Sequence, residues 1–350
     1  MGRTRREVLS GTAGALATGA FAGCTGRLQE IAGEETLEDG GYAAFFTLFD
    51  FARHVGGETF AFENPVPVGT MGHRYEPGPD LATEVASHQA FVYLDVEGFQ
   101  RWALDAAEAI ERDHPSVQLI DALEGIELRE YDNENAHTEN ENTHTDDANT
   151  ATDDANTDTD DHDDETDDRL GDFDPHYWTD PVLAAESVEN VIAGLQEADP
   201  ENEDVYAENG EAYLDRLDEL HRTFETGLAD RDHDVVVVAA HDSYQYLAER
   251  YGLRIHSPQG VSPHAQPSQE EISETIELID RNGIDVVLAD HFESADLANT
   301  IVRDSNASEV QRISPAEGTT VEWNERGWGY IEQMENINLP ALQAAVGINA

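Results

Sequence analysis

Lysine is absent from this chain of 350 residues, and its 19 basic residues, all arginine, stand against 75 aspartates and glutamates. The formal net charge of −56 leaves no basic face with which to displace the counterions of duplex nucleic acid. Binding to anionic lipid through surface charge is disfavoured for the same reason. Because concentrated salt screens the self-repulsion of so much acid, we expect a halophilic protein that unfolds at low salt.

Cysteine is also scarce, since Cys24 is the single one in the chain. One cysteine excludes a disulfide framework and zinc sites built on two or more thiolates. It follows a twin arginine, Arg5-Arg6, and a Gly/Ala-rich apolar stretch, 9–22, that is too short to span a bilayer. We expect 1–24 to be a twin-arginine lipoprotein signal, Cys24 to carry the lipid after cleavage, and 25–40 to be a polar tether. The protein is then expected at the extracellular face of the membrane, held there only by lipid.

Two stretches of the chain alternate short apolar runs with helical patterns, which predicts an α/β fold with mostly parallel sheets. An N-terminal lobe is expected over 41–180 and a C-terminal lobe over 231–350, with helices flanking both sheets. A helical pattern over 181–230 pauses at Asp199-Pro200 and is expected to form the long connector helix between the lobes. The expected strands lie within 42–51 and at 66–68, 91–94, 117–120, 235–238, 253–255 and 284–288. The expected helices are 100–110, 244–251, 270–281 with Ser268 as cap and Gly283 as stop, 297–302, and 330–346 with a break or kink at Pro340.

One segment, 132–168, breaks this pattern with 16 acidic residues, no basic residue and three histidines, His137, His144 and His162. A run with so little apolar surface cannot form a core, so we expect a disordered acidic loop within the N-terminal lobe. Two roles stay open. The loop either collects zinc weakly, or it is a solvated insert with no metal role.

Four residues at expected loop positions have side chains that bind metals: His73, His176, His241 and Asp290. His241 and Asp290 follow strands of the second lobe, and His73 follows a strand of the first. Ligands of parallel α/β sheets bind outside the carboxyl ends of the strands. Three imidazoles and one carboxylate would complete a tetrahedral Zn²⁺ shell in the cleft between the lobes. The long spacings provide no local metal motif, so each residue also fits a hydrogen-bonded loop position or a helix cap.

Several motifs in their order along the chain make a family resemblance. They are Pro-Val-Gly-Thr-Met-Gly-His-Arg-Tyr-Glu-Pro, Asp-Pro-His-Tyr-Trp-Thr-Asp-Pro, Ala-His-Asp-Ser-Tyr-Gln-Tyr, the strand ending at Asp290, and Asn-Ile-Asn-Leu. With them the chain resembles the solute-binding proteins of zinc and manganese ABC importers, the high-affinity zinc-uptake family. The resemblance implies two lobes bridged by a rigid helix, a metal in the cleft, and delivery to a membrane permease. It also implies His73, His176, His241 and Asp290 as ligands. The segment after Asp290, His291-Phe292-Glu293-Ser294, departs from the family pattern, so Glu293 and His291 are the alternatives to Asp290.

The metal and the function follow from the same resemblance. In this family the third ligand tends to be His in zinc members and Glu in manganese members, and here it is His241, so zinc is expected before manganese. A secreted zinc hydrolase needs an open coordination position and a base, and neither His-Glu-x-x-His nor Gly-x-Ser-x-Gly occurs. We therefore expect a monomeric binding protein and no enzyme. A surface adhesin without a transporter stays an alternative, which a neighbouring permease gene would distinguish.

Overall fold

The computed structural model describes residues 37–130, 173–260 and 266–348. The expected export signal, Cys24, most of the tether and the acidic loop lie outside the described residues. The tether prediction is wrong at its end, because a strand already begins at Glu38. None of the described helices is long and apolar enough to cross a membrane.

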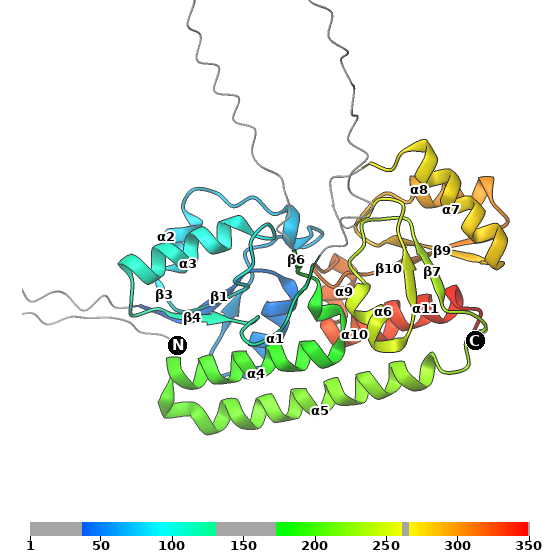
Figure 1. Ribbon diagram of the computed structural model, residues 1–350. Coiled ribbons are helices and arrows are strands. Elements are labelled where there is room, and N and C mark those ends of the chain that lie inside the picture. The colour runs from blue at the N-terminus through cyan, green and yellow to red at the C-terminus, as the bar shows by residue number, and fades with distance from the viewer. Residues whose placement is uncertain (1–36, 131–172, 261–265, 349–350) are drawn as a thin grey trace, which may run out of the picture. The chain divides into compact units, whose positions relative to one another are not determined.

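The N-terminal lobe contains a sheet of four parallel strands in the order β2-β1-β3-β4 (Figure 1). The prediction of a strand at 66–68 is wrong. Pro65 and Pro67 flank Val66 and lack the N–H groups that a strand needs, so this stretch forms a loop. The strands are β1 (Glu38–Ala43), β2 (Phe62–Glu63), β3 (His88–Tyr93) and β4 (Gln118–Asp121), and the helices are α1 (Phe46–Gly56), α2 (Leu81–Val85) and α3 (Arg101–Asp113).

The C-terminal lobe contains a second parallel sheet in the order β10-β9-β7-β8. Its strand of four valines is buried along its whole length, as is typical of a strand covered on both faces. Ser268 caps its helix and Gly283 ends it in the left-handed conformation, as predicted, and Glu271 completes a capping box with Ser268. The strands are β7 (Val235–Val238), β8 (Arg254–His256), β9 (Val286–Asp290) and β10 (Glu309–Ile313), and the helices are α6 (Gln245–Tyr251), α7 (Gln269–Asn282), α8 (Asp296–Asp304) and α9 (Val321–Glu325).

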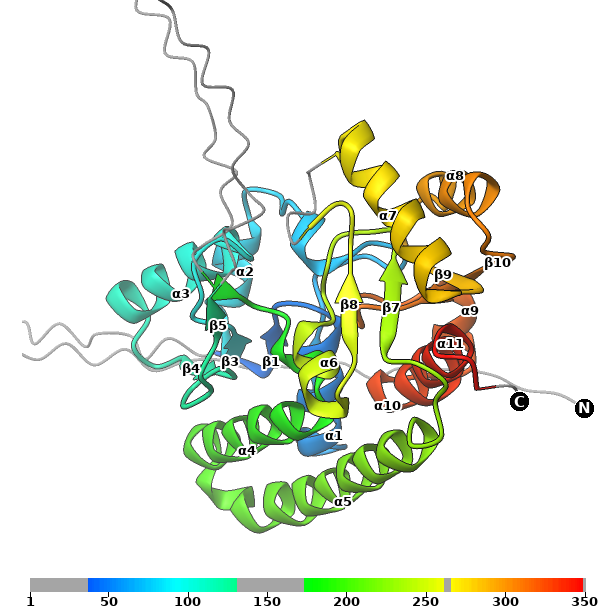
Figure 2. The ribbon, with the colours of Figure 1, turned by 45° about the vertical axis from the view of Figure 1, so that its right-hand side comes forward.

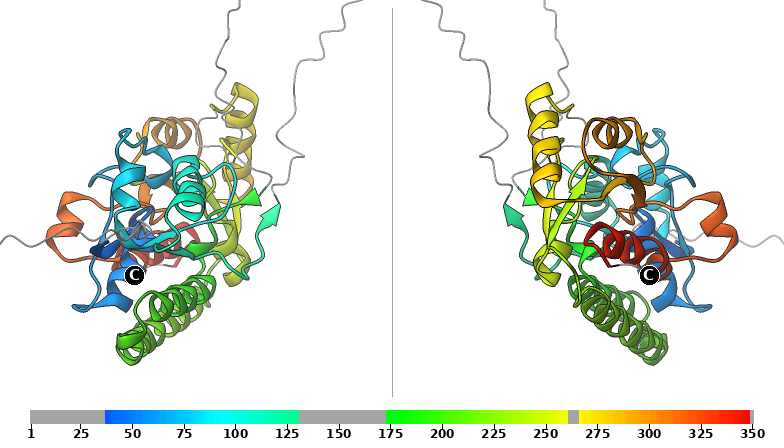
Figure 3. Two further views of the ribbon diagram at one scale, coloured as in Figure 1. Left: turned by 90° about the vertical axis from the view of Figure 1, so that its left-hand side faces the viewer. Right: turned by 90° about the vertical axis from the view of Figure 1, so that its right-hand side faces the viewer.

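The helical connector predicted over 181–230 consists of two helices, which separate at the predicted pause, Asp199-Pro200. Asp180 caps α4 (Pro181–Ala198), and α5 (Glu203–Gly227) follows after a 3₁₀ turn at Pro200–Asn202. The Asp199 carboxylate accepts hydrogen bonds from the Tyr206 hydroxyl and from Asn202, which stabilises the reversal of the chain. The two helices lie side by side, and α5 continues beneath the C-terminal lobe (Figures 1 and 2). Figure 3 shows the pair close to end-on, below both sheets.

The chain ends in a helical region made of α10 (Tyr330–Gln333), a π-helix (Met334–Asn338) and α11 (Leu339–Ala345). The sequence predicts a break or kink at Pro340, and the structure interrupts the α-helix with this π-helix just before that residue. A wider turn accommodates the missing N–H of Pro340 without ending the helix.

A single hydrophobic cluster runs through both lobes. It joins Phe45 and Phe91 of the first lobe to Trp178, to Val236 of the second sheet and to Tyr330 near the C-terminus. A second cluster fills the space between the second sheet and helices α7 and α8. Because the lobes share buried apolar surface, separating them would expose that surface to water.

Candidate metal centre

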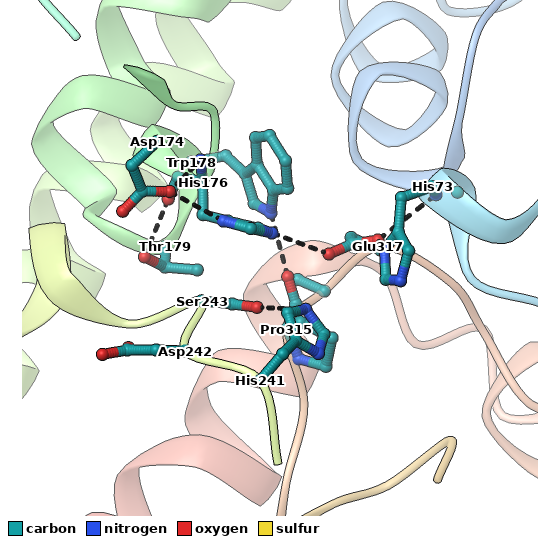
Figure 4. A network of polar contacts seen from close by, with 12 residues as sticks. His73, Asp174, His176, Trp178, Thr179, His241, Asp242, Ser243, Pro315 and Glu317 are labelled. Carbon is teal, nitrogen blue, oxygen red and sulfur yellow. Dashed lines mark hydrogen bonds and ion pairs between the residues drawn. The ribbon is translucent and has the colours of Figure 1, made fainter. Parts of the chain in front are cut away.

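Glu317 lies at the centre of a buried group of polar side chains, between His73 and His176 (Figure 4). Its Oε2 pairs with Nδ1 of His73, and its Oε1 lies 3.3 Å from Nε2 of His176. No part of Glu317 is exposed to solvent. The carboxylate therefore joins a histidine from each of two segments that are far apart in the sequence.

His241 completes the group from the end of β7. Its ring centroid lies 5.0 Å from that of His73 and 5.6 Å from that of His176. One ligand atom each from His73, His241 and Glu317 lie within 4.8 Å of one another, close enough to hold one metal ion. We call His73, His176, His241 and Glu317 the cage.

Unsatisfied polar atoms point to a cation as the missing partner of the cage. Nε2 of His73, Nδ1 of His241 and the hydroxyl of Tyr244 are buried, and none finds a hydrogen-bond partner in the described part of the chain. Buried polar atoms without partners are costly and rare in proteins. A divalent ion bound to imidazole nitrogens would satisfy two of these atoms at once.

The electrostatics of the cage depend on close contacts between imidazole and carboxylate. Burial disfavours a charge on His176, but hydrogen bonds to the carboxylates of Asp174 and Glu317 outweigh this effect and raise its pKa to about 10. Burial likewise opposes ionisation of Glu317, but the charge of His73 and the hydrogen bonds from both histidines hold its pKa well below the usual value. At pH 7 His176 is therefore protonated, and its positive charge lies between the carboxylates of Asp174 and Glu317.

The structure places the predicted ligand Asp290 beside the cage and not within the three-residue group. Asp290 ends β9 and is 1% exposed, and its Oδ1 accepts a hydrogen bond of 2.7 Å from the backbone N–H of Phe292. Burial raises its pKa to about 7, although the charge of His241 opposes the rise. Of the two substitutes, Glu293 lies 3.7 Å from Nδ1 of His241, whereas His291 packs against Trp323 with 4.3 Å between ring centroids.

Sequence reasoning missed Glu317 because it also missed the strand before it. In β10 the two apolar residues, Val310 and Ile313, are separated by Gln311 and Arg312, so the stretch lacks the period-two alternation of a half-buried strand and is a weak signal that ends at Ser314-Pro315. Recognising this strand would have placed Glu317 just beyond a carboxyl end, next to those of β7 and β9 in the same sheet.

The segment that carries Glu317 is bound to both lobes. Trp178 Nε1 donates to the Pro315 carbonyl over 2.9 Å, and the Thr47 hydroxyl donates to the carbonyl of Ala316. Ala316 has a φ of 59°, a conformation that costs energy in a residue other than glycine. From the other side, Asn338 bonds both the N–H and the carbonyl of Ser314, each over 2.8 Å. This pair of hydrogen bonds to Ser314 gives Asn338 of the Asn-Ile-Asn-Leu motif a structural role.

The loop that carries His73 meets the same segment. The N–H of Gly69 donates to the Thr319 carbonyl over 2.8 Å, and a Cβ on Gly318 would lie 2.5 Å from the Thr70 carbonyl oxygen. Only glycine permits so close an approach of two backbones. Gln100 also stabilises the loop, because its Nε2 donates a hydrogen bond to the Gly72 carbonyl over 3.1 Å.

Three of the four cage residues are buried, and His73 is partly buried. His176, His241 and Glu317 are 2%, 1% and 0% exposed. A surface cavity of about 580 Å³ lies elsewhere, between Asp95, Asp121 and Phe173 at the end of the first sheet. The ring atoms Nε2 of His73 and Nδ1 of His241 are themselves buried, so an ion reaches them only when neighbouring side chains or the lobes move.

Two parallel sheets whose carboxyl ends carry a buried group of imidazoles and a carboxylate define a class of protein able to hold one divalent cation. The family model described as zinc-uptake complex component A, periplasmic (ZnuA), matches residues 42–345. The chain belongs to this family.

Relatives with known names support the assignment. The chain is 27% identical over 303 residues to the zinc-binding lipoprotein AdcA of Streptococcus pneumoniae, which covers 85% of this chain and 54% of AdcA. It is 26% identical over 299 residues to the high-affinity zinc uptake system protein ZnuA of Bacillus subtilis, covering 85% of both chains. The chain thus spans about half the length of AdcA. Its fold matches the crystal structure of the Zn(II)-bound ZnuA-like domain of AdcA with a TM-score of 0.68 and 25% identity, over 88% of this chain and 99% of that one.

Proposed function

We propose that this protein captures Zn²⁺ outside the cell and delivers it to an ABC permease. The observation that carries the proposal is the cage, in which three histidines surround one buried carboxylate in a chain of the zinc-uptake family. In this proposal His73, His176, His241 and Glu317 are the four ligands. Glu317 takes the place that the sequence assigned to Asp290, because its carboxylate contacts two of the histidines directly.

The donor set favours zinc over manganese. Imidazole nitrogen suits Zn²⁺, whereas Mn²⁺ prefers sites richer in carboxylate and water. Four protein donors with no open position are typical of a closed tetrahedral zinc site, and such a site leaves no coordination place for a catalytic water. Binding without catalysis is therefore part of the proposal.

Competitive titration tests the choice of metal. We expect the purified protein to bind one Zn²⁺ per chain and to retain it in the presence of excess Mn²⁺, because nitrogen ligands bind Zn²⁺ more tightly than Mn²⁺. Metal content by mass spectrometry after dialysis measures both quantities. A protein that keeps Mn²⁺ and releases Zn²⁺ would make manganese the cargo.

Zinc binding is expected to release protons at pH 7. The pKa of His176 is raised to about 10, so this ring carries a proton at pH 7 that zinc must displace. Glu317, whose pKa is lowered, is already ionised and releases none. The apparent affinity should therefore fall as the pH falls, by about tenfold per pH unit for each proton released. Calorimetry in buffers of different ionisation enthalpy counts the protons, and a count of zero would contradict this cage chemistry.

The cellular setting belongs to the same proposal. A twin-arginine signal over 1–24 would export the folded protein, and a lipid on Cys24 would hold it at the extracellular face of the membrane. The charge of −56 suits a halophilic protein that acts as a monomer in concentrated salt. The partner would be the permease of an ABC importer.

A further inference from the structure

We propose that Asp174 is a positioning residue that holds His176 in the orientation and tautomer needed to bind the cargo ion. This inference rests on the proposed zinc-binding function. The Oδ1 atom of Asp174 accepts two hydrogen bonds from one residue, from the backbone N–H of His176 over 3.0 Å and from its ring Nδ1 over 2.7 Å. Both residues are 2% exposed, so water does not compete for these bonds.

The contact determines which ring nitrogen faces the cage. A neutral imidazole carries one N–H, and a carboxylate accepts but cannot donate. When zinc displaces the second ring proton, Asp174 therefore keeps the proton on Nδ1 and leaves the lone pair on Nε2, the atom 3.3 Å from Glu317 (Figure 4). A charged acceptor also makes the opposite nitrogen more basic and thus a stronger metal ligand.

The other two histidines of the cage lack such a fixed arrangement. Nε2 of His241 lies 2.7 Å from the Ser243 hydroxyl, which can donate or accept and so does not select a tautomer. Nδ1 of His73 pairs with Glu317, which itself belongs to the cage. His176 is thus the histidine whose tautomer is determined by a carboxylate outside the cage.

Asp174 is held firmly enough for this role. Its backbone belongs to β6 (Phe173–Asp174), which pairs antiparallel with β5 (Arg129–Glu130). The hydroxyl of Tyr246 donates to the Asp174 carbonyl over 2.7 Å and accepts from the N–H of Arg129 over 2.8 Å. Helix α6 of the C-terminal lobe thereby fixes the residue that orients His176.

The second carboxylate oxygen argues against a purely structural role. Oδ2 of Asp174 is buried and has no hydrogen-bond partner in the described part of the chain. A buried carboxylate with an unsatisfied oxygen costs stability and is expected to be retained for some other reason. Orienting a ligand for the cargo ion is such a reason.

The experiment compares Asp174→Asn and Asp174→Ala with the matched control Asp242→Asn in the full chain. Asp242 is also a buried aspartate, 5% exposed, and its carboxylate accepts from the N–H of Tyr244 and from Gln245. Zinc affinity is measured by chelator competition and metal-free stability by thermal unfolding. The Nδ1 proton of His176 is followed by ¹H–¹⁵N NMR of the zinc-loaded protein.

We expect Asp174→Asn to weaken zinc binding by about 10- to 100-fold, the usual effect of changing a hydrogen-bond partner of a ligand, and Asp174→Ala to weaken it at least as much. The Nδ1–H signal, shifted downfield by the carboxylate, should move upfield in the Asn variant and disappear in the Ala variant. Asp242→Asn should leave the zinc affinity and the Nδ1–H signal of His176 unchanged. The positioning role is overturned if both Asp174 variants keep full zinc affinity. It is also overturned if they lose zinc affinity together with a matching loss of metal-free stability while the Nδ1–H signal of His176 stays in place. If the parent protein binds no zinc, the proposed function fails instead, so the two failures are distinct.

Discussion

Replacing Glu317 with Gln is expected to weaken zinc binding by more than about 100-fold, which exceeds the usual cost of changing an outer partner of a ligand. The substitution keeps the shape of the side chain but removes the negative charge that His73 and His176 both contact. An amide oxygen is a weaker zinc donor than a carboxylate, and its NH₂ group would face an imidazole nitrogen. Chelator competition measures the affinity, and circular dichroism shows whether the fold is retained.

Asp290→Asn is the matched control for Glu317→Gln, because both carboxylates are buried near His241. We expect a far smaller loss of affinity from Asp290→Asn, since Asp290 bonds the N–H of Phe292 and lies outside the three-residue group. The opposite ranking would return the fourth ligand position to Asp290, where the sequence motif first placed it. Equal losses in both variants would indicate that both carboxylates bind the ion.

Replacing Asp50 with Ala is expected to destabilise the metal-free protein by about 3 kcal/mol, because it breaks a buried charged network. Asp50 is fully buried, and its Oδ2 accepts from the Tyr213 hydroxyl over 2.8 Å and from the N–H of Tyr330 over 2.9 Å. Its Oδ1 lies 2.6 Å from the Arg53 guanidinium. The carboxylate thus links α1 to α5 and to α10, and its loss leaves the buried Tyr213 hydroxyl and Tyr330 N–H without this acceptor.

Asp218→Ala is the control for Asp50→Ala. Asp218 pairs with Arg222 at 2.8 Å on α5, but both side chains are more than 60% exposed. Such surface pairs contribute about 0–1 kcal/mol, so this variant should unfold close to the parent. Urea unfolding of both variants at one salt concentration measures the difference. A parent-like Asp50→Ala would show that the three helices are held by apolar packing alone.

Much of the fold was predictable because its signals are local. The valine strand β7, the capping box at Ser268 and the left-handed Gly283 each depend on a few neighbouring residues. The three histidines were also predictable as candidate ligands, since each lies in a short sequence motif and these motifs follow one another in the order typical of the family. The prediction of helix arrangement was weaker where one local pattern is compatible with two chain directions, as at Asp199-Pro200. The predicted pause is there, but whether the chain continues or reverses depends on packing between α4 and α5.

The sequence by itself determined the α/β class, the family, the acidic character and the three candidate histidines. Only the tertiary structure decided which carboxylate joins them. His73 and Glu317 are 244 residues apart, and their contact exists because Thr47, Trp178 and Asn338 hold the segment after β10 against both lobes. Periodicity and capping report on residues within a few turns of one another, whereas a ligand cage is made where distant segments meet, and no local pattern encodes that meeting.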